Sequence, residues 1–311
     1  MKPAALTRRS VMAGIAAMPL VSAPAILAGA RPAMAQATAA PAIAPYRRFS
    51  VGDFTVTTLL AGTRPMDNPQ EIFGLNASAE DFAALSQAAF IPSDKSMNFF
   101  TPTLVETGSE VILFDTGLSP ESITAALSAA GKSPDQISIV VLTHMHGDHI
   151  GGLMSGDTPT FTNARYVTGQ VEFDHWAAAS NENFESKVRP LAERMAFIGD
   201  GADVAGGITS VAAFGHSPGH MAYHLESNGR HLMLTADTAN HFVWSLQRPD
   251  WEVRYDMDKS AAAATRKSLL GRIAAEKIPF VGYHMPFPGT GYLEARNEGF
   301  QFVPVAYQLD L

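Results

Sequence analysis

The chain has 311 residues, of which 46% are hydrophobic and 17% are charged. This length and apolar content are enough for one large hydrophobic core, so a disordered protein is excluded. Cysteine is absent, so the fold has no disulfides, and any bound metal is held by nitrogen and oxygen atoms. The formal charge of −8 disfavours nucleic acid and anionic membranes as partners.

The first 35 residues differ in composition from the rest. Arg8 and Arg9 precede an apolar stretch over residues 11–27, and Ala-Met-Ala at positions 33–35 offers a cleavage point. The arginine pair resembles a twin-arginine export signal. We therefore expect a signal peptide over residues 1–35 and a periplasmic or secreted protein; an ordinary secretory signal or an uncleaved anchor is the alternative. This segment carries four basic residues and no acidic one, which leaves 18 basic and 30 acidic residues, a formal charge of −12.

The next segment, residues 36–45, is rich in Ala, Pro and Thr and predicts a flexible leader. Composition and turn residues then predict the elements of the first half in chain order: a strand at 54–60, a helix at 79–89 after Ser78, a hairpin of 103–106 with 110–114, a helix from Ser119 to Gly131, and a strand at 137–142. The connection from 62 to 98 is long, and connections of this length often cover a site.

Helices and strands alternate in the second half as well. The expected helices are 170–179, 185–196 and 258–277, and the expected strands are 208–214, 222–226 and 231–235. The almost continuous apolar run at 137–142 is typical of a strand buried on both faces. This alternation predicts a layered α/β fold in a single domain over residues 46–311.

Three imidazoles and a carboxylate follow that apolar strand within six residues: His144, His146, Asp148 and His149. Loops after the carboxyl ends of strands are common ligand-binding positions in α/β folds. Burying these four side chains unpaired would cost much free energy. In extended backbone, His144 and His146 point the same way and can hold one ion, while Asp148 and His149 can face a second. The segment therefore predicts a site for divalent metal.

This His-x-His-x-Asp-His string resembles the signature of the metallo-β-lactamase superfamily. Matching elements follow in order: Gly-His-Ser-Pro-Gly-His at 215–220, then Asp237 and His284, each after a predicted strand. The resemblance implies a four-layer αββα sandwich and two divalent ions, zinc before manganese, cobalt or iron. It implies that one ion is held by His144, His146, His220 and Asp237, and the other by Asp148, His149, Asp237 and His284. It also implies that Asp115 orients a ligand histidine, whereas His216 is expected to hydrogen-bond within its own loop.

The same resemblance implies a reaction. A hydroxide shared by the two ions attacks the substrate, with Asp148 and Asp237 as the catalytic carboxylates and Asp148 passing a proton to the leaving group. Among family branches, the chain resembles the exported methyl parathion hydrolases and the related lactonases most closely, through residues 51–54, 287–289 and 299–307. A lactone or ester is the expected substrate, an N-acyl homoserine lactone among them.

Two other activities remain open. An organophosphate triester is the second choice, because Asp-Thr-Gly at 115–117 leads almost directly into the next helix, where methyl parathion hydrolases carry a longer loop. A metal-binding protein without catalytic activity is the third. Candidates for an apolar wall of the substrate pocket are Trp176, Phe173, Phe184 and Phe287. A homodimer is expected from the resemblance, and no membrane partner is expected after signal cleavage.

Overall fold

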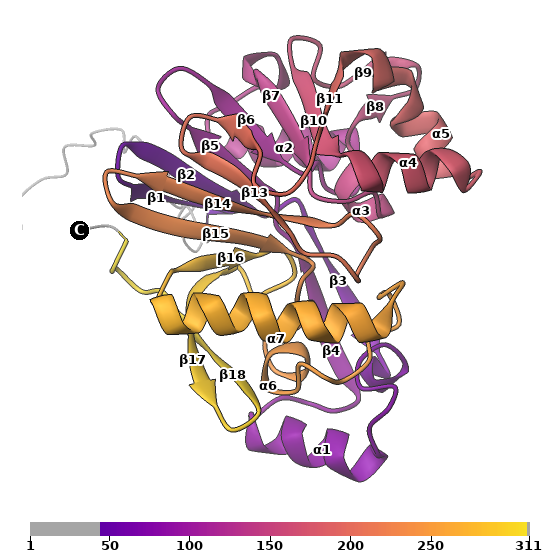
Figure 1. The fold of residues 1–311 in the computed structure, drawn as a ribbon, viewed down its shortest axis with the longest axis vertical. Coiled ribbons are helices and arrows are strands. Elements are labelled where there is room, and N and C mark those ends of the chain that lie inside the picture. The colour runs from indigo at the N-terminus through magenta and orange to yellow at the C-terminus, as the bar shows by residue number, and fades with distance from the viewer. Residues whose placement is uncertain (1–43, 310–311) are drawn as a thin grey trace, which may run out of the picture. The chain divides into compact units, whose positions relative to one another are not determined.

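The computed structural model describes residues 44–309, which form two seven-stranded sheets stacked face to face (Figure 1). The strands of the first sheet are, in spatial order, β1 (Tyr46–Val51), β2 (Phe54–Leu59), β5 (Thr103–Glu106), β6 (Val111–Phe114), β7 (Ile139–Leu142), β10 (Arg165–Gly169) and β11 (Met195–Ile198). Those of the second are β12 (Asp203–Ala205), β13 (Ile208–Ala212), β14 (Met221–Ser227), β15 (Arg230–Ala236), β16 (Phe280–Gly282), β17 (Thr290–Arg296) and β18 (Gly299–Pro304). The predicted signal peptide and most of the predicted leader lie outside the described residues.

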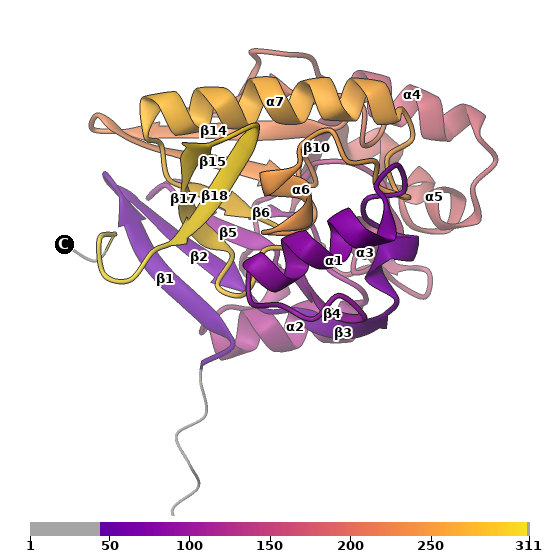
Figure 2. The same cartoon turned by 90° about the horizontal axis from the view of Figure 1, so that it is seen from below.

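Helices cover the outer face of each sheet. The α-helices are α1 (Ala79–Ala88), α2 (Pro120–Ala129), α3 (Gly147–Ile150), α4 (Gln170–Ala178), α5 (Glu182–Lys187), α6 (Trp244–Gln247) and α7 (Lys259–Glu276). Figure 2 shows α7 along one side and α2 along the opposite side. Ile123 and Leu127 of α2 share a core with the first sheet, and Leu270 and Ile273 of α7 share one with the second. With the core between the sheets, this gives the four-layer αββα sandwich that the family resemblance implies.

Strand β7 shows how the sequence pattern produces these layers. All four of its side chains are fully buried. Val140 and Leu142 point into the core under α2, whereas Ile139 and Val141 point into the core between the sheets. Successive side chains of a strand face opposite sides, so a strand covered on both faces needs an unbroken apolar run. The prediction of a doubly buried strand is confirmed.

Two predictions about elements are wrong or incomplete. The expected helix at 185–196 is instead the end of α5, a 3-10 helix at Arg189–Arg194 and the edge strand β11. Pro190 prevents a continuous helix, and parallel pairing with β10 fixes the following residues as a strand. The connection at 62–98 holds the expected helix α1 and also a ribbon of two antiparallel strands, β3 (Gly62–Asp67) and β4 (Lys95–Phe100).

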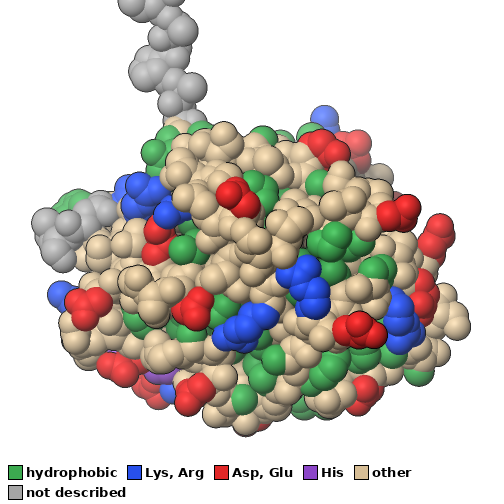
Figure 3. Space-filling view, turned by 90° about the horizontal axis from the view of Figure 1, so that it is seen from above, with side chains coloured by type: hydrophobic (Ala, Val, Ile, Leu, Met, Phe, Trp, Pro, Cys, Tyr) green, Lys and Arg blue, Asp and Glu red, His purple; other side chains and the backbone are tan. Residues whose placement is uncertain are grey.

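The surface and the helices bear on possible partners. On the face in Figure 3, acidic and basic side chains are interspersed, and no large basic patch is visible there. Within residues 44–309, none of the helices combines the length and the apolar character that crossing a bilayer requires.

Two short strands, β8 (Met154–Ser155) and β9 (Thr158–Pro159), complete the fold.

Candidate metal centre

The His-x-His-x-Asp-His segment begins where β7 ends. His144 and His146 precede α3, and the single turn of α3 carries Asp148 and His149. The ring centroid of His144 lies 4.7 Å from that of His146 and 4.0 Å from that of His149. The side chains of this one loop therefore converge, as its spacing predicts.

Asp115 fixes this loop from the neighbouring strand β6. Its Oδ1 accepts a hydrogen bond from the backbone N–H of Thr143 at 2.9 Å, and its Oδ2 accepts from the Thr143 hydroxyl at 2.8 Å. The same Oδ2 lies 2.8 Å from Nδ1 of His149. A carboxylate on Nδ1 fixes the tautomer of an imidazole and leaves Nε2 free to bind a metal.

The second sheet supplies two further side chains from the ends of adjacent strands. Asp237 follows β15 and His284 follows β16. Nδ1 of His284 is 2.8 Å from the carbonyl oxygen of Phe99, and its Nε2 is 3.1 Å from Oδ2 of Asp237 and 3.4 Å from Oδ2 of Asp148. The site therefore lies where the carboxyl ends of strands from both sheets meet.

The resulting cluster has the donor set of a metal site. Three groups have potential ligand atoms within 4.8 Å of one another: His144 with His146 and His216; His144 with His149 and Asp237; and Asp148 with His149 and His284. Within the described residues, buried Nε2 atoms of His144 and His149 and Oδ1 of Asp237 have no hydrogen-bond partner. Unsatisfied buried imidazole and carboxylate atoms that face one another fit a bound cation.

The two histidines of the Gly-His-Ser-Pro-Gly-His element have different surroundings. His216 Nε2 lies 3.0 Å from Nδ1 of His146 and 3.3 Å from Oδ2 of Asp237. His220 Nδ1 instead donates to the carbonyl oxygen of Ala213 at 3.1 Å, and its Nε2 accepts from the backbone N–H of Asp237 at 3.1 Å. The prediction that His216 bonds only within its own loop is wrong. His216 belongs to one of the ligand groups, whereas the ring centroid of His220 lies 5.0 Å from that of His144 and its role as a ligand stays a prediction.

A buried ion pair holds His216 in this orientation. Nδ1 of His216 lies 3.0 Å from Oδ1 of Asp256, and Oδ2 of Asp256 lies 2.8 Å from Nη1 of Arg266. All three side chains are almost completely buried. A histidine held by a carboxylate in this way is the usual arrangement of a metal ligand, and nothing in the sequence around Asp256 predicts it.

Glu172 of α4 joins the two histidine-bearing loops. Its side chain is fully buried. Oε1 accepts from the backbone N–H of Met145 at 3.0 Å and from the indole N–H of Trp176 at 2.7 Å. Oε2 accepts from the hydroxyl of Ser217 at 2.7 Å and from the backbone N–H of Gly219 at 2.8 Å. One carboxylate therefore holds the backbone of Met145, between His144 and His146, together with the hydroxyl of Ser217 and the backbone of Gly219, which lie between His216 and His220.

The electrostatics of the cluster divide its histidines into two sets. Burial lowers the pKa of His146 to about 3 and that of His220 to about 3. Burial also opposes protonation of His216 and His284, but nearby carboxylates, Asp237 foremost, outweigh it and raise their pKa values to about 9 and about 10. The pKa of His149 is likewise raised well above its ordinary value by Asp237 and Asp115, against the effect of burial. Without metal, the carboxylates therefore favour the protonated form of these three imidazoles.

Metal binding should therefore release protons. Zinc titrated into metal-depleted protein at pH 7 is expected to displace about three protons, because only neutral imidazole binds metal. In metal-depleted protein, protonation of His216 and His284 stabilises the fold, and this stabilisation is complete below pH 6.5, the ordinary pKa of histidine. It is lost as the pH rises through their raised pKa values, about 9 for His216 and about 10 for His284. The number of protons that zinc binding displaces should fall over the same pH range. Calorimetry in buffers of different ionisation enthalpy measures it; binding at pH 7 without proton release would contradict this account.

A cavity of about 480 Å³ opens above the cluster. Its polar lining outside the cluster includes Arg64, Asn98, Asn183 and Lys187, and its apolar lining includes Phe73, Phe100, Leu118 and Tyr255. The predicted aromatic wall is wrong for Phe184, which is fully buried in the core under the first sheet. Phe173 and Trp176 pack against that same core, and Phe287 is not part of the lining.

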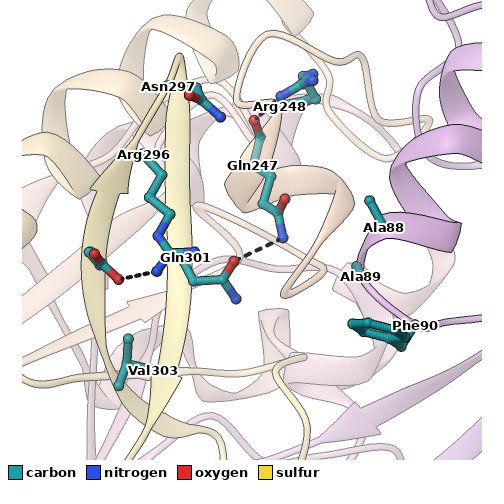
Figure 4. Close-up of a pocket in the computed structure, with 10 residues that line it drawn as sticks. Ala88, Ala89, Phe90, Gln247, Arg248, Arg296, Asn297, Gln301 and Val303 are labelled. Atoms are coloured by element: carbon teal, nitrogen blue, oxygen red, sulfur yellow. Dashed lines mark hydrogen bonds and ion pairs between the residues drawn. The ribbon is translucent and has the colours of Figure 1, made fainter.

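A second cavity, shown in Figure 4, has no such donor set. It measures about 540 Å³ and lies among the end of α1, α6 and the hairpin β17–β18. Gln247 donates to Gln301 across it at 3.3 Å, and Glu294, its one acidic side chain, is paired with Arg296 at 3.0 Å. Neither histidine nor a free carboxylate lines this cavity, so the metal chemistry belongs to the cluster at the strand ends.

The fold and this cluster agree with a family comparison. The model of the metallo-β-lactamase superfamily matches residues 101–275, which is more than half of the chain. The protein therefore belongs to the metallo-β-lactamase superfamily and is a metal-dependent hydrolase by membership. The matched segment contains the His-x-His-x-Asp-His string, the Gly-His-Ser-Pro-Gly-His element and Asp237.

The individual relatives have low sequence identity to this chain. An N-acyl homoserine lactonase of Bacillus thuringiensis is 27% identical over 210 residues, covering 58% of this chain and 79% of its own. The structure of AidC, a dizinc quorum-quenching lactonase, superposes with a TM-score of 0.78 at 23% identity, over 85% of this chain and 98% of AidC. The hydrolase AbOPH superposes with a TM-score of 0.79 at 23% identity, over 86% and 99%. At these identities the structural similarity shows the fold alone.

Proposed function

We propose that this protein is a dinuclear hydrolase that opens lactones or cleaves esters, with N-acyl homoserine lactones as candidate substrates. The observation that carries the proposal is the chain of overlapping ligand groups, in which His144 belongs to two groups and His149 to two. A single-ion site needs only one such group, whereas overlapping groups suit two adjacent ions. The lactonase relatives support the choice of substrate.

The ligand sets follow from these groups. His144, His146 and His216 are proposed to hold the first ion, and Asp148, His149 and His284 the second. Asp237 is proposed to bridge, since its Oδ2 lies 3.3 Å from Nε2 of His216 and 3.1 Å from Nε2 of His284. Imidazole nitrogen and carboxylate oxygen suit zinc, with manganese, cobalt and iron as alternatives. Such ions, when bound, supply a water of lowered pKa and polarise the carbonyl that it attacks.

The carboxylates of the chain have different surroundings and different proposed roles. The side chain of Asp148 is 26% exposed, whereas that of Asp237 is 4% exposed. Asp148 therefore faces the cavity and can pass a proton to the ring oxygen of a lactone as the acyl C–O bond breaks. The hydroxyl of Tyr283 donates to the backbone carbonyl of Asp148 at 2.6 Å and holds this turn in place. Asp237 accepts from the amide of Asn240 at 2.9 Å.

A panel of chromogenic substrates tests the proposal. The mature protein, with zinc, manganese or cobalt added, is offered a lactone, an aryl ester and an aryl phosphotriester. We expect hydrolysis of the lactone and the ester to exceed that of the phosphotriester, which is the second candidate. Faster turnover of the phosphotriester would favour that candidate. No turnover of any substrate by protein that binds two equivalents of metal would favour a binding role and overturn the hydrolase proposal.

The assignment of His216 can be tested against His220. His216→Asn is expected to lower the metal content from about two ions per chain to about one. His220→Asn is expected to retain both ions and to lower thermal stability, because it loses hydrogen bonds to Ala213 and Asp237. Elemental analysis after dialysis measures the metal content. The reverse pattern, with His220→Asn losing an ion and His216→Asn losing none, would restore His220 as the ligand.

We also propose that the protein is exported by the twin-arginine route. Replacing Arg8 and Arg9 by lysine is expected to leave uncleaved precursor in the cytoplasm, since this route requires the arginine pair. Fractionation of cells that express the wild-type and double-variant chains measures the distribution. Normal export of the double variant would exclude the twin-arginine route.

The expected homodimer stays a prediction.

A further inference from the structure

The ribbon β3–β4 forms one wall of the cavity above the metal cluster. Arg64 and Asn98 are register partners, and both line this cavity. The next pair, Pro65 and Met97, lines a separate apolar cavity of about 470 Å³. Alternate side chains of a strand face opposite sides, so the Arg64–Asn98 pair faces the cavity above the cluster and the Pro65–Met97 pair faces the other way.

Two cations are anchored at this cavity from different elements. The guanidinium carbon of Arg64 lies 5.5 Å from the ring centroid of Phe100, and the Phe100 ring lies 5.5 Å from the ring of His284. Lys187, at the end of α5, donates from Nζ to the carbonyl oxygen of Gly151 at 3.3 Å, just after α3. Arg64 therefore contacts a ring that packs against the proposed ligand His284. Lys187 binds the segment that follows α3, the helix that carries Asp148 and His149.

The acidic groups of the cavity do not neutralise these cations. The only carboxylates in its described lining are Asp148 and Asp237, and both belong to the cluster that binds metal. Amide groups of Asn98 and Asn183 add further donors to the lining. With those two carboxylates engaged by metal, Arg64 and Lys187 would remain as positive charges in the lining of a chain whose formal charge is −8. Positive charges without an acidic partner in a cavity attract anionic ligands.

We propose that the substrate carries an anionic group, such as a carboxylate, remote from the bond that is cleaved, and that Arg64 and Lys187 bind this group. The proposal rests on the hydrolase function proposed above and specifies its substrate class. The guanidinium of Arg64 can donate two parallel hydrogen bonds to a carboxylate, and Lys187 adds a second positive charge. Water supplies the oxygen that joins the acyl carbon; the acyl C–O bond breaks, and the leaving oxygen retains the electron pair.

Two p-nitrophenyl esters of equal chain length test this specificity. The hemiester of glutarate carries a terminal carboxylate where the ester of valerate carries a methyl group. At low ionic strength we expect kcat/KM for the glutarate ester to exceed that for the valerate ester at least about tenfold, and the preference to shrink at about 0.5 M salt. The double variant Arg64→Gln/Lys187→Gln is expected to reduce the ratio at least about fivefold, through a raised KM for the anionic ester.

Lys267→Gln is the matched control, because Lys267 is exposed on α7 and does not line the cavity. It should change neither the rates nor their ratio. An equal or better rate with the valerate ester, or an equal loss for both esters in the double variant, would overturn the proposal. If metal-loaded protein cleaves neither ester, the proposed function fails, and calorimetric binding of glutarate against valerate still decides the inference: tighter glutarate binding that the double variant loses supports it, and equal binding overturns it.

Discussion

Asp237→Ala is expected to lose bound metal and hydrolytic activity together, with kcat falling at least about 10³-fold, the upper range for losing one electrostatic catalytic group. The reason is the position of this carboxylate. Its Oδ1 lies 3.2 Å from Nε2 of His149, and its Oδ2 lies 3.1 Å from Nε2 of His284 and 3.3 Å from Nε2 of His216. Removing it leaves three buried imidazoles without their shared counter-charge, so both proposed ion positions are weakened.

Metal content after dialysis and the rate of ester hydrolysis measure this effect. Asp157→Ala is the control, because Asp157 is exposed in the turn between β8 and β9 and lies outside the metal cavity. Circular dichroism shows whether each variant is folded. A folded Asp237→Ala protein that keeps two ions and full turnover would contradict the bridging role and the proposed mechanism with it.

Local sequence predicts much of this site, because several of its residues are neighbours in the chain. His144, His146, Asp148 and His149 stand in one loop after an apolar strand, and the structure brings them together as their spacing implies. The four-layer fold that the family resemblance implies is also confirmed, whereas the alternation of apolar runs with capped helices predicts only a layered α/β class. The arrangement of residues that are neighbours in the chain does not depend on which distant strands pair, so it can be predicted from the local sequence.

Long-range contacts decide what sequence reasoning misses. His216 and His220 lie in one short element, and their orientations depend on Asp256 and Asp237, which are distant in the chain. The pairing of β3 with β4 is also a long-range contact. Its strands are separated by α1, and Pro65 weakens the strand signal of the first, so its pairing and its polar face become visible only in the fold. The cavity lining therefore differs from the aromatic wall that composition predicts.

Glu172→Ala is expected to have the second large effect, on stability as well as on metal binding. Three buried donors, on Met145, Ser217 and Gly219, and the partly buried indole N–H of Trp176 would lose their acceptor. Each unpaired buried donor costs about 1–3 kcal/mol, so the alanine variant is expected to unfold or to be strongly destabilised. Glu172→Gln separates the two effects. Its amide oxygen can serve one pair of donors, while its NH₂ group faces the other pair and cannot accept.

We expect Glu172→Gln to remain folded and to bind zinc about 10–100-fold more weakly than the wild type, the usual cost of losing an orienting partner of a metal ligand. Competition with a chromogenic chelator measures the affinity, and circular dichroism measures folding. Asp174→Asn on the same helix is the control, because Asp174 is exposed and contacts only Gln170 through its side chain within the described residues. Since Glu172 holds Met145, next to His146, and Ser217, next to His216, weakening should fall on the first ion. Unchanged affinity in a folded Glu172→Gln protein would show that the two loops hold their geometry without this carboxylate.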